Sequence, residues 1–596
     1  KNSNTNADVS FAQQPVHGVV KDAKGAPLGG ATVTNKNSKA STATDADGSF
    51  SINASEGDIL VISFVGYDKI EIKITSSTTA LVVSSDRQED LSEIDQSNGF
   101  RPGQTLSLSS SLNIVLSQKI SSLTEIVINK GYYKEQKKFS TGNVSKVTSK
   151  DIEQQPVLNP LLALQGRVPG LFITQANGLP GSGVTVRIQG QNSIGKGNDP
   201  LYVIDGVPYI SQLPSTFLSS PLGSSGGPVI NGVQSGSGNP LSYINPGDIE
   251  SIEVLKDADA TAIYGSRAAN GAILITTKKG IAGQTKLDVN LQAGGGKVTR
   301  TLDLLNNPKY LEMRREALRN DGLSIGSTDY DINGTWDTTR YTNWQKELIG
   351  NVARYNNIQV NVSGGTSNLQ YLIGGTFRQE TYVFPGDFVD NKGSVHFNVN
   401  NVSKNQKFKI SLSGNYLIDN NKLPSTDLTN IAITLAPDAP ELYNSNGSLN
   451  WEPISSGSST VSTWANPLAN LLRVYKTKTN NIISSVNLSY KIFSGFEVSS
   501  NFGFTDLQAV ESRISPIIAF PPEKRADALR TTSYANNSVT SWIIEPQINY
   551  RRSFKNGKLE ALVGTTIQQN NTNGFTLTGI GYNSDLVLED LQSATS

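Results

Sequence analysis

Residues 223–227 (GSSGG) match the G-x-S-x-G pattern in which a serine serves as a nucleophile. That chemistry needs a strand before the serine, a helix after it and a histidine within reach. Here the motif lies in a Gly/Ser-rich stretch after Pro221, and His17 and His396 are the only histidines in the chain. We therefore expect no catalytic serine, and we expect that the protein is not an enzyme.

The chain also offers few side chains for a metal or a nucleic acid. Its 596 residues include no Cys and two His, which excludes thiolate sites and makes a His-rich site very improbable. Residues 45–48 (DADG) begin like a calcium loop but lack the remaining ligands and the closing Glu, so they indicate a turn. Lys plus Arg and Asp plus Glu are 51 each, and this zero net charge argues against a broad nucleic-acid surface. No metal and no cofactor are expected.

The N-terminal elements that could carry a function are short strands. Residues 1–15 form a polar leader without the apolar core of a signal peptide. Short strands with Gly/Asp turns at regular spacing predict a small β-sandwich over residues 16–122. Residues 123–138 form a hydrophilic connector that contains a β-prone run.

Residues 139–280 mix helices and strands. A helix is expected over 158–164, after Pro156, and a second short helix over 256–264. A Gly/Ser/Pro-rich loop joins residues 209 and 242, and so long a loop in a compact domain is usually functional or mobile. The expected strands are 171–174, 184–188, 201–204, 251–255 and 272–277.

Residues 281–596 alternate strictly between apolar and polar side chains, as in residues 358–362 (IQVNV). About nine segments follow this pattern, with helices at 307–320 and 344–348 in long connections. A soluble sandwich alternates as well. An uncharged polar face, aromatic residues near strand ends, and connections that alternate between short and long favour a transmembrane β-barrel.

Several long motifs in residues 139–280 resemble the plug domain of SusC/RagA-like TonB-dependent outer-membrane transporters. They are far more specific than one short pattern, because they are long and occur in the family's order. The motifs are residues 164–173 (LQGRVPGLFI), 178–181 (GLPG), 186–190 (VRIQG), 198–208 (NDPLYVIDGVP), 248–271 (DIESIEVLKDADATAIYGSRAANG) and 275–280 (ITTKKG).

The flanking regions resemble the same family. Residues 18–22 (GVVKD), 27–33 (PLGGATV), 44–48 (TDADG) and 64–67 (FVGY) are similar to the carboxypeptidase-regulatory-like domain, a module without peptidase chemistry. Residues 343–347 (NWQKE) and 362–366 (VSGGT) look like the start of the family's barrel.

The resemblance implies a mainly β protein with three parts: a small β-sandwich at 16–122, an α+β plug at 139–280, and the N-terminal part of a transmembrane antiparallel β-barrel at 281–596. The family barrel has about 22 strands, which about nine segments cannot close. The chain is therefore expected to be the N-terminal part of a longer protein, or to be incompletely resolved.

The resemblance also implies roles for single residues. Residues 125–132 (EIVINKGY) look like the TonB box, whose strand would be Glu125, Ile126, Val127, Ile128 and Asn129. TonB binds such a segment by β-augmentation, which needs a β-prone run in a polar setting. Without the resemblance, the same run is an ordinary strand of the sandwich.

Other positions correspond to the plug surfaces that face the substrate and the barrel. The candidate substrate contacts are Gln191, Asn192, Ser193 and Tyr209, together with the Gly/Ser loop from Ser219 to Ser242, which is otherwise a disordered insertion. Arg187 is the candidate plug–barrel contact. Gln189 stands where the family usually has a second Arg, which puts an ion pair from that position in doubt. Trp451 and Trp464 in a long loop are expected to be exposed, and either stack on sugars or pack the loops or the lid.

For the whole protein, the resemblance implies TonB-dependent import of a glycan or a peptide across the bacterial outer membrane. The expected partners are a SusD-like surface lipoprotein that acts as a lid, TonB with its energising complex, and outer-membrane lipid. A dimer of transporter–lid pairs is compatible with this assembly, and the N-terminal domain would lie in the periplasm. The alternative is a non-transporting barrel that serves as a scaffold in a surface or secretion complex.

Deletion of residues 125–129 tests the TonB-box assignment. We expect the deletion to abolish energised uptake and to leave substrate binding intact, because the segment would bind TonB and not the ligand. Uptake and equilibrium binding of one labelled substrate should be measured side by side. Unchanged uptake in the deletion variant would contradict the assignment.

Overall fold

The structure is a computed structural model. Two compact units, Lys1–Glu125 and Ile126–Ser596, make up the chain. The described residues are 14–22, 25–65, 67, 69–76, 79–85, 105–107, 111–116, 127–129, 134–136, 143–155, 157, 159–194, 197–213, 221–223, 229–230, 233–234, 238–256, 262–457, 459–554 and 557–596.

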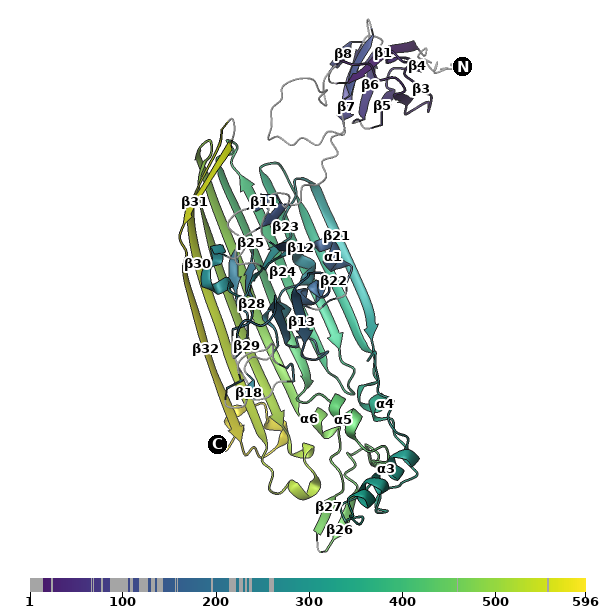
Figure 1. Ribbon diagram of the computed structural model, residues 1–596, viewed down its shortest axis with the longest axis vertical. Coiled ribbons are helices and arrows are strands. Elements are labelled where there is room, and N and C mark those ends of the chain that lie inside the picture. The colour runs from purple at the N-terminus through teal and green to yellow at the C-terminus, as the bar shows by residue number, and fades with distance from the viewer. Residues whose placement is uncertain are drawn as a thin grey trace, which may run out of the picture. The chain divides into compact units, whose positions relative to one another are not determined.

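The first unit is the predicted β-sandwich (Figure 1). Alternate side chains of its strands point inward, so that Leu60 and Ile62 of β5 and Ile72 of β6 are fully buried in one apolar core. A three-stranded sheet has the order β4 (Ser49–Ala54), β1 (Gln14–Asp22), β9 (Leu112–Leu116). A six-stranded sheet has the order β3 (Ser41–Ala43), β2 (Thr32–Asn35), β5 (Ile59–Ser63), β6 (Ile70–Ser76), β7 (Thr79–Ser85), β8 (Thr105–Ser107).

The second unit begins with a short antiparallel pair, β10 (Val127–Asn129) and β11 (Lys134–Gln136). The plug follows as a five-stranded sheet with an adjoining hairpin, β13 (Leu171–Gln175) and β14 (Val184–Ile188). The sheet order is β12 (Val144–Thr148), β19 (Ile249–Leu255), β20 (Ala272–Thr277), β15 (Leu201–Ile204), β16 (Val207–Tyr209). A further short pair is β17 (Val229–Ile230) with β18 (Val233–Gln234).

Short helices complete the plug. The helix expected over 158–164 is the 3-10 helix η2 (Pro160–Leu164), which begins where the Asn159 side chain accepts the Leu161 N–H. Of the helix expected over 256–264, residues 257–261 lie outside the described part, and η5 (Ala262–Ala268) is also a 3-10 helix. The other helices are α1 (Ser149–Glu153), η3 (Pro240–Tyr243) and η4 (Pro246–Asp248).

The rest of the second unit contains a single large antiparallel sheet, which we call the wall. Among the described residues it has ten strands, of which β31 and β32 both pair with β30 and share one position, which leaves nine positions. The order is β21 (Gly283–Gly296), β22 (Ala353–Gly365), β23 (Leu369–Thr381), β24 (Val389–Val402), β25 (Phe408–Pro424), β28 (Val474–Phe493), β29 (Phe496–Ser515), β30 (Thr531–Phe554), β31 (Gly557–Gly564), with β32 (Ile567–Ile580) beside β30.

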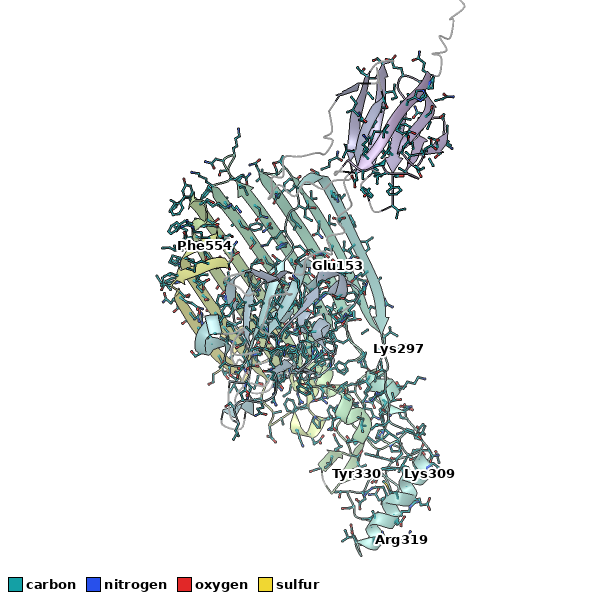
Figure 2. All side chains as sticks on the ribbon, turned by 45° about the horizontal axis from the view of Figure 1, so that its top comes forward. Glu153, Lys297, Lys309, Arg319, Tyr330 and Phe554 are labelled. Atoms are coloured by element: carbon teal, nitrogen blue, oxygen red, sulfur yellow. The ribbon has the colours of Figure 1, made fainter. Side chains whose placement is uncertain are left out.

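The wall connections alternate between short and long, as predicted. Ser494 and Gly495 alone join β28 to β29, whereas residues 297–352 join β21 to β22. Figure 2 shows Lys309, Arg319 and Tyr330 of that long connection at one end of the wall and Phe554 at the other. The long connections contain α3 (Asn307–Asn320), α4 (Trp344–Ile349), α5 (Thr429–Thr434), β26 (Pro453–Ser456), β27 (Ser459–Ser462), α6 (Ala469–Leu472), η6 (Ile517–Ala519) and η7 (Pro522–Lys524), and η8 (Asp585–Val587) and η9 (Leu591–Ser593) follow β32.

None of the helices in the described part is long and apolar enough to cross a membrane. The mainly β architecture, with its sandwich, its α+β plug and its alternating sheet, confirms the predicted fold class. The apolar core of the plug gathers residues from η2, from the hairpin and from all five strands of the sheet.

Leu161 tests that core, because its side chain is fully buried. We expect Leu161→Ala to lower the free energy of plug unfolding by about 2–5 kcal/mol, through lost burial and a cavity. The measurement is urea-induced unfolding of the full-length protein, followed with a probe on the plug. Leu323→Ala, at a side chain that is 60% exposed, should change the same quantity by less than about 0.5 kcal/mol. Equal effects of the two substitutions would contradict this packing.

Candidate functional site

The face of the wall that contacts the plug is polar. Successive side chains of a strand point to opposite faces, and along β24 the ones that are buried are polar while Val395 on the opposite face is 51% exposed. Figure 1 shows the plug elements and the wall strands in the same part of the second unit. The buried polar residues of β24 are Asp390, Lys392, Ser394, His396 and Asn398.

Uncharged amide groups make most of the hydrogen bonds between plug and wall. The bonds connect four different plug segments with five wall strands, so that the interface is spread over the whole plug. The bonds are Asn245 Nδ2 to Thr376 Oγ1 (2.9 Å), Asn481 Nδ2 to the Tyr243 carbonyl (3.1 Å), Asn421 Nδ2 to the Pro180 carbonyl (3.2 Å), Asn501 Nδ2 to the Gly206 carbonyl (3.2 Å) and Gln359 Nε2 to Asp248 Oδ1 (3.0 Å).

One plug carboxylate, Asp248, is held between two wall amides. Besides the bond from Gln359, its Oδ2 accepts a hydrogen bond from Asn415 Nδ2 at 3.4 Å. Burial raises the pKa of Asp248, and the nearby His396 imidazole acts in the opposite direction. His396 itself contacts the plug, since its Nε2 lies 3.1 Å from the Lys278 carbonyl oxygen. The histidine of the wall therefore serves the plug interface.

A second carboxylate, Asp205, fixes the turn between β15 and β16. Its backbone lies in the left-handed region, with φ of 47°, and Gly206 follows with φ of 85°. The Asp205 carboxylate accepts hydrogen bonds from the Thr277 N–H (3.0 Å), from Thr277 Oγ1 (2.6 Å) and from Ser413 Oγ of the wall (3.3 Å). This aspartate belongs to the motif VIDGVP that carries the resemblance.

Three of the predicted substrate contacts lie together in one plug loop. Gln191 accepts a hydrogen bond from Arg187 Nη1 (2.8 Å) and donates one to the Ser193 carbonyl (2.8 Å). The backbone N–H groups of Asn192 and Ser193 both donate to Asn198 Oδ1, at 3.0 and 2.8 Å. The loop is thus ordered by its own polar groups, and its role in substrate binding stays a prediction.

The fourth predicted contact, Tyr209, lies elsewhere. Its side chain is buried, and its hydroxyl donates to Asn481 Oδ1 of the wall at 3.1 Å. In this arrangement Tyr209 is a plug–wall contact. Of the Gly/Ser loop 219–242 that was expected to bind substrate, half of the residues lie outside the described part, and the loop ends in the buried helix η3 (Pro240–Tyr243).

Arg187 is placed on the hairpin, opposite Phe172 in the pairing of β13 with β14. Its hydrogen bond to Gln191 stays within the plug, so its predicted contact with the barrel stays a prediction. Gln189 is exposed and has φ of 57°, and its N–H donates to the Gly170 carbonyl at 2.8 Å. Its backbone therefore shapes a turn at this position.

The predicted TonB box is described in part. Glu125 and Ile126 lie outside the described residues, whereas Val127, Ile128 and Asn129 form β10. This strand pairs with β11 along one edge. The described half of the segment therefore has the extended backbone that β-augmentation uses.

Two family models match parts of this chain. The family model described as TonB-dependent Receptor Plug Domain matches residues 136–272, and the CarboxypepD_reg-like domain matches residues 16–96. TonB-dependent receptor P26 of Formosa agariphila is 29% identical over 594 residues, which cover 96% of this chain and 52% of the relative. TonB-dependent receptor SusC of Bacteroides thetaiotaomicron is 29% identical over 502 residues, which cover 81% of this chain and 43% of the relative.

These matches make the chain similar to the SusC-like TonB-dependent transporters over most of its length.

A solved structure supports the same fold. The RagAB peptide importer in the open-open state matches with a TM-score of 0.63 and 21% identity, over 79% of this chain and 52% of that chain. The chain spans about half the length of the curated relatives it matches. The relatives are TonB-dependent receptors and transporters and not enzymes, and receptors of this kind are outer-membrane β-barrels.

The long connections of this SusC-like protein share an apolar core with the plug. Trp344, Phe384 and Trp464 pack there with Leu179 from the tip of the plug hairpin. Trp464 is 8% exposed and donates from Nε1 to the Asn450 carbonyl, and Trp451 is 5% exposed. The expectation that the two tryptophans are exposed is therefore wrong, because both side chains pack the loops.

Charged groups order the same connections. Arg314 donates to Asp331 (2.6 Å) and to Asp329 (3.2 Å), and Tyr310 donates to Asp331 (2.9 Å). Burial alone would raise the pKa of Asp331, but these hydrogen bonds lower it. No group of three or more His, Cys, Asp or Glu side chains is placed to hold a metal ion in the part of the chain that the structure describes.

The sequence could have indicated one feature that we missed. Most inward positions of the wall carry uncharged side chains, but Asp390, Lys392 and Asp419 carry charges at inward positions. Since alternation alone assigns the inward face, charged residues in that register stand out in the sequence.

Asp438 generates a pH prediction. Its carboxylate is fully buried, and burial together with the charge of Asp331 raises its pKa to about 6. The folded protein thus binds this proton more tightly than the unfolded chain, and ionisation destabilises the loops as the pH rises through 6. We expect Asp438→Asn to slow hydrogen exchange of the long connections at pH 7.5, relative to the wild type, and to have little effect at pH 4.

The control for Asp438 is Asp321→Asn, at an exposed aspartate of the same set of connections. This variant should exchange the amide hydrogens of the long connections at the same rate as the wild type at both pH values. An Asp438→Asn effect of the same size at pH 4 and pH 7.5 would contradict the role of ionisation.

Proposed function

We propose that this protein imports a nutrient, a glycan or a peptide, across the outer membrane by a TonB-dependent mechanism, as the barrel partner of a SusD-like lipoprotein. The observation that carries the proposal is a plug sheet held against the polar face of a barrel-type sheet through hydrogen bonds that mostly involve uncharged amide groups. Such a plug blocks a polar passage and remains removable.

The strength of these bonds supports a movable plug. A neutral hydrogen bond contributes about 0.5–1.5 kcal/mol net, because water replaces the lost partner when the bond opens. Bonds to charged groups are roughly twice as strong. An interface of neutral amides therefore holds the plug firmly as a whole, while each bond can be broken in turn by an external force.

The force would come from TonB. In the proposal, TonB pairs with the segment 125–129, whose described residues form β10. A pull on this segment reaches the plug through residues 130–143 and arrives at β12, which is an edge strand of the plug sheet. An edge strand has one hydrogen-bonded neighbour, so it can be detached without disrupting the rest of the sheet. The N-terminal sandwich would lie in the periplasm on the same side as TonB.

The substrate would meet the plug from the opposite side. Gln191, Asn192 and Ser193 offer amide and hydroxyl groups that suit the hydroxyls of a glycan and the backbone of a peptide alike. The structurally similar RagAB is described as a peptide importer, and SusC as a TonB-dependent receptor. The proposed assembly is a transporter–lid pair, which can form a dimer of pairs.

Gene deletion with uptake measurements tests the proposal. A strain without the protein should lose growth on one defined glycan or peptide, and the full-length gene should restore it. Affinity purification of the full-length protein from outer membranes should recover a SusD-like lipoprotein. Normal uptake of every nutrient tested, together with loss of a surface or secretion complex, would contradict import and favour the scaffold alternative.

A further inference from the structure

A buried lysine on the wall faces the plug. Lys392 lies on β24, and only 6% of its side chain is exposed. Its ammonium lies 3.4 Å from Asp390 Oδ2 and 3.4 Å from Asp419 Oδ2. Asp419 is directly opposite Lys392 in the pairing of β24 with β25, and Asp390 lies two residues away on the same face. The strand register thus brings together Asp390, Lys392 and Asp419, which we call the wall triad. Arg378 and Glu380 of β23 lie beside it, opposite Lys392 and Asp390.

The triad also reaches the plug. Lys392 Nζ donates to the Ser242 carbonyl oxygen at 3.4 Å and lies 5.8 Å from the centre of the Tyr243 ring. An ammonium has three N–H donors and no acceptor. The ammonium is ion-paired with the two wall carboxylates, and one of its N–H groups donates to the plug. The Tyr243 ring adds a cation–π contact on the plug side.

Ser242 and Tyr243 belong to η3, which is fastened to the rest of the plug. The η3 helix begins where Asn239 accepts the Leu241 N–H, and Asn159 donates to Asn239 (3.1 Å) and to Ser242 Oγ (3.1 Å). Asn159 in turn caps η2. A displacement of η3 therefore strains two helices of the plug, which makes η3 an effective point at which to hold the plug.

We propose that Lys392 is a positioning residue that latches η3, and with it the plug, to the wall. Its contact is charge-assisted and therefore stronger than the neutral amide contacts elsewhere in the interface. The two carboxylates keep the ammonium paired when the plug leaves, so release breaks one hydrogen bond and one ring contact without stranding a buried charge. The contact between Lys392 and η3 can therefore re-form when the plug returns. The proposal rests on the proposed function in one respect, that the plug moves during import.

A double-mutant cycle in planar lipid bilayers tests the latch. The full-length protein is compared as wild type, Lys392→Met, Tyr243→Leu and the double variant, and the fraction of time in a conducting state is measured without TonB and without substrate. Each single variant should raise that fraction about 10-fold, in keeping with the loss of one contact to a charged group. The double variant should exceed the larger single effect by less than about 3-fold, because the ring contact that Tyr243→Leu removes is already lost in Lys392→Met.

If the fold-changes of the two single variants multiply in the double variant, the proposal is overturned. Unchanged conductance in both single variants would overturn it as well. Any change that Lys392→Met causes within the wall is present in both Tyr243 backgrounds and therefore cancels in the cycle. If Lys392→Met prevents barrel assembly, Tyr243→Leu alone decides: conductance equal to the wild type would contradict the latch.

Lys422→Met is the matched control. Lys422 lies on β25, and its ammonium is 5.9 Å from the centre of the Phe388 ring, a contact that does not involve the plug. Its substitution should leave conductance unchanged. The measurement uses neither substrate nor TonB, so its result does not depend on import. The conductance can contradict the latch in a protein that imports a nutrient, and it can support the latch in a protein that imports nothing.

Discussion

The alternation of side chains along a β-strand is the constraint on which the rest of this structure depends. In the wall it sends one set of side chains toward the plug and the other set away, so that the inward set must be polar and hydrogen-bonded while the outward set is apolar. A shift of one residue in register would exchange the two sets along a whole strand. Every plug contact described above depends on this register, from the Asn–carbonyl bonds to the wall triad.

The inward set explains how the plug is held. Its members are mostly Asn, Gln, Ser and Thr, whose bonds to plug carbonyls are individually weak and can be exchanged with water. The wall triad keeps its ion pairs when the plug moves, because Lys392 stays with Asp390 and Asp419 on the wall. The low charge content, 17% of the chain, fits an interface made of neutral polar groups. Leu179, at the tip of the plug hairpin, packs in the apolar core of the long connections and stabilises the plug at a second place.

Much of this fold follows from local patterns in the sequence. The period-two segments predicted the wall strands, and 307–320 and 344–348 predicted the two helices between β21 and β22, because those patterns depend on few neighbours. The pairing partners of residues distant in sequence could not be predicted, and Lys392 with Ser242 is one such pair. The burial of Tyr209 and of the two tryptophans could not be predicted for the same reason: the sequence shows that a side chain is aromatic but not which loop or strand covers it.

A disulfide across the interface tests most directly whether the plug must leave the wall. Asn245 and Thr376 are bonded side chain to side chain at 2.9 Å, and the 596 residues contain no Cys, so cysteines at these two positions can be joined by a short thiol-reactive linker that contains a disulfide. Uptake of a labelled substrate should be measured for the full-length double variant before and after reduction. The account predicts no energised uptake in the oxidised protein and recovery on reduction. Equal uptake in both states would contradict it.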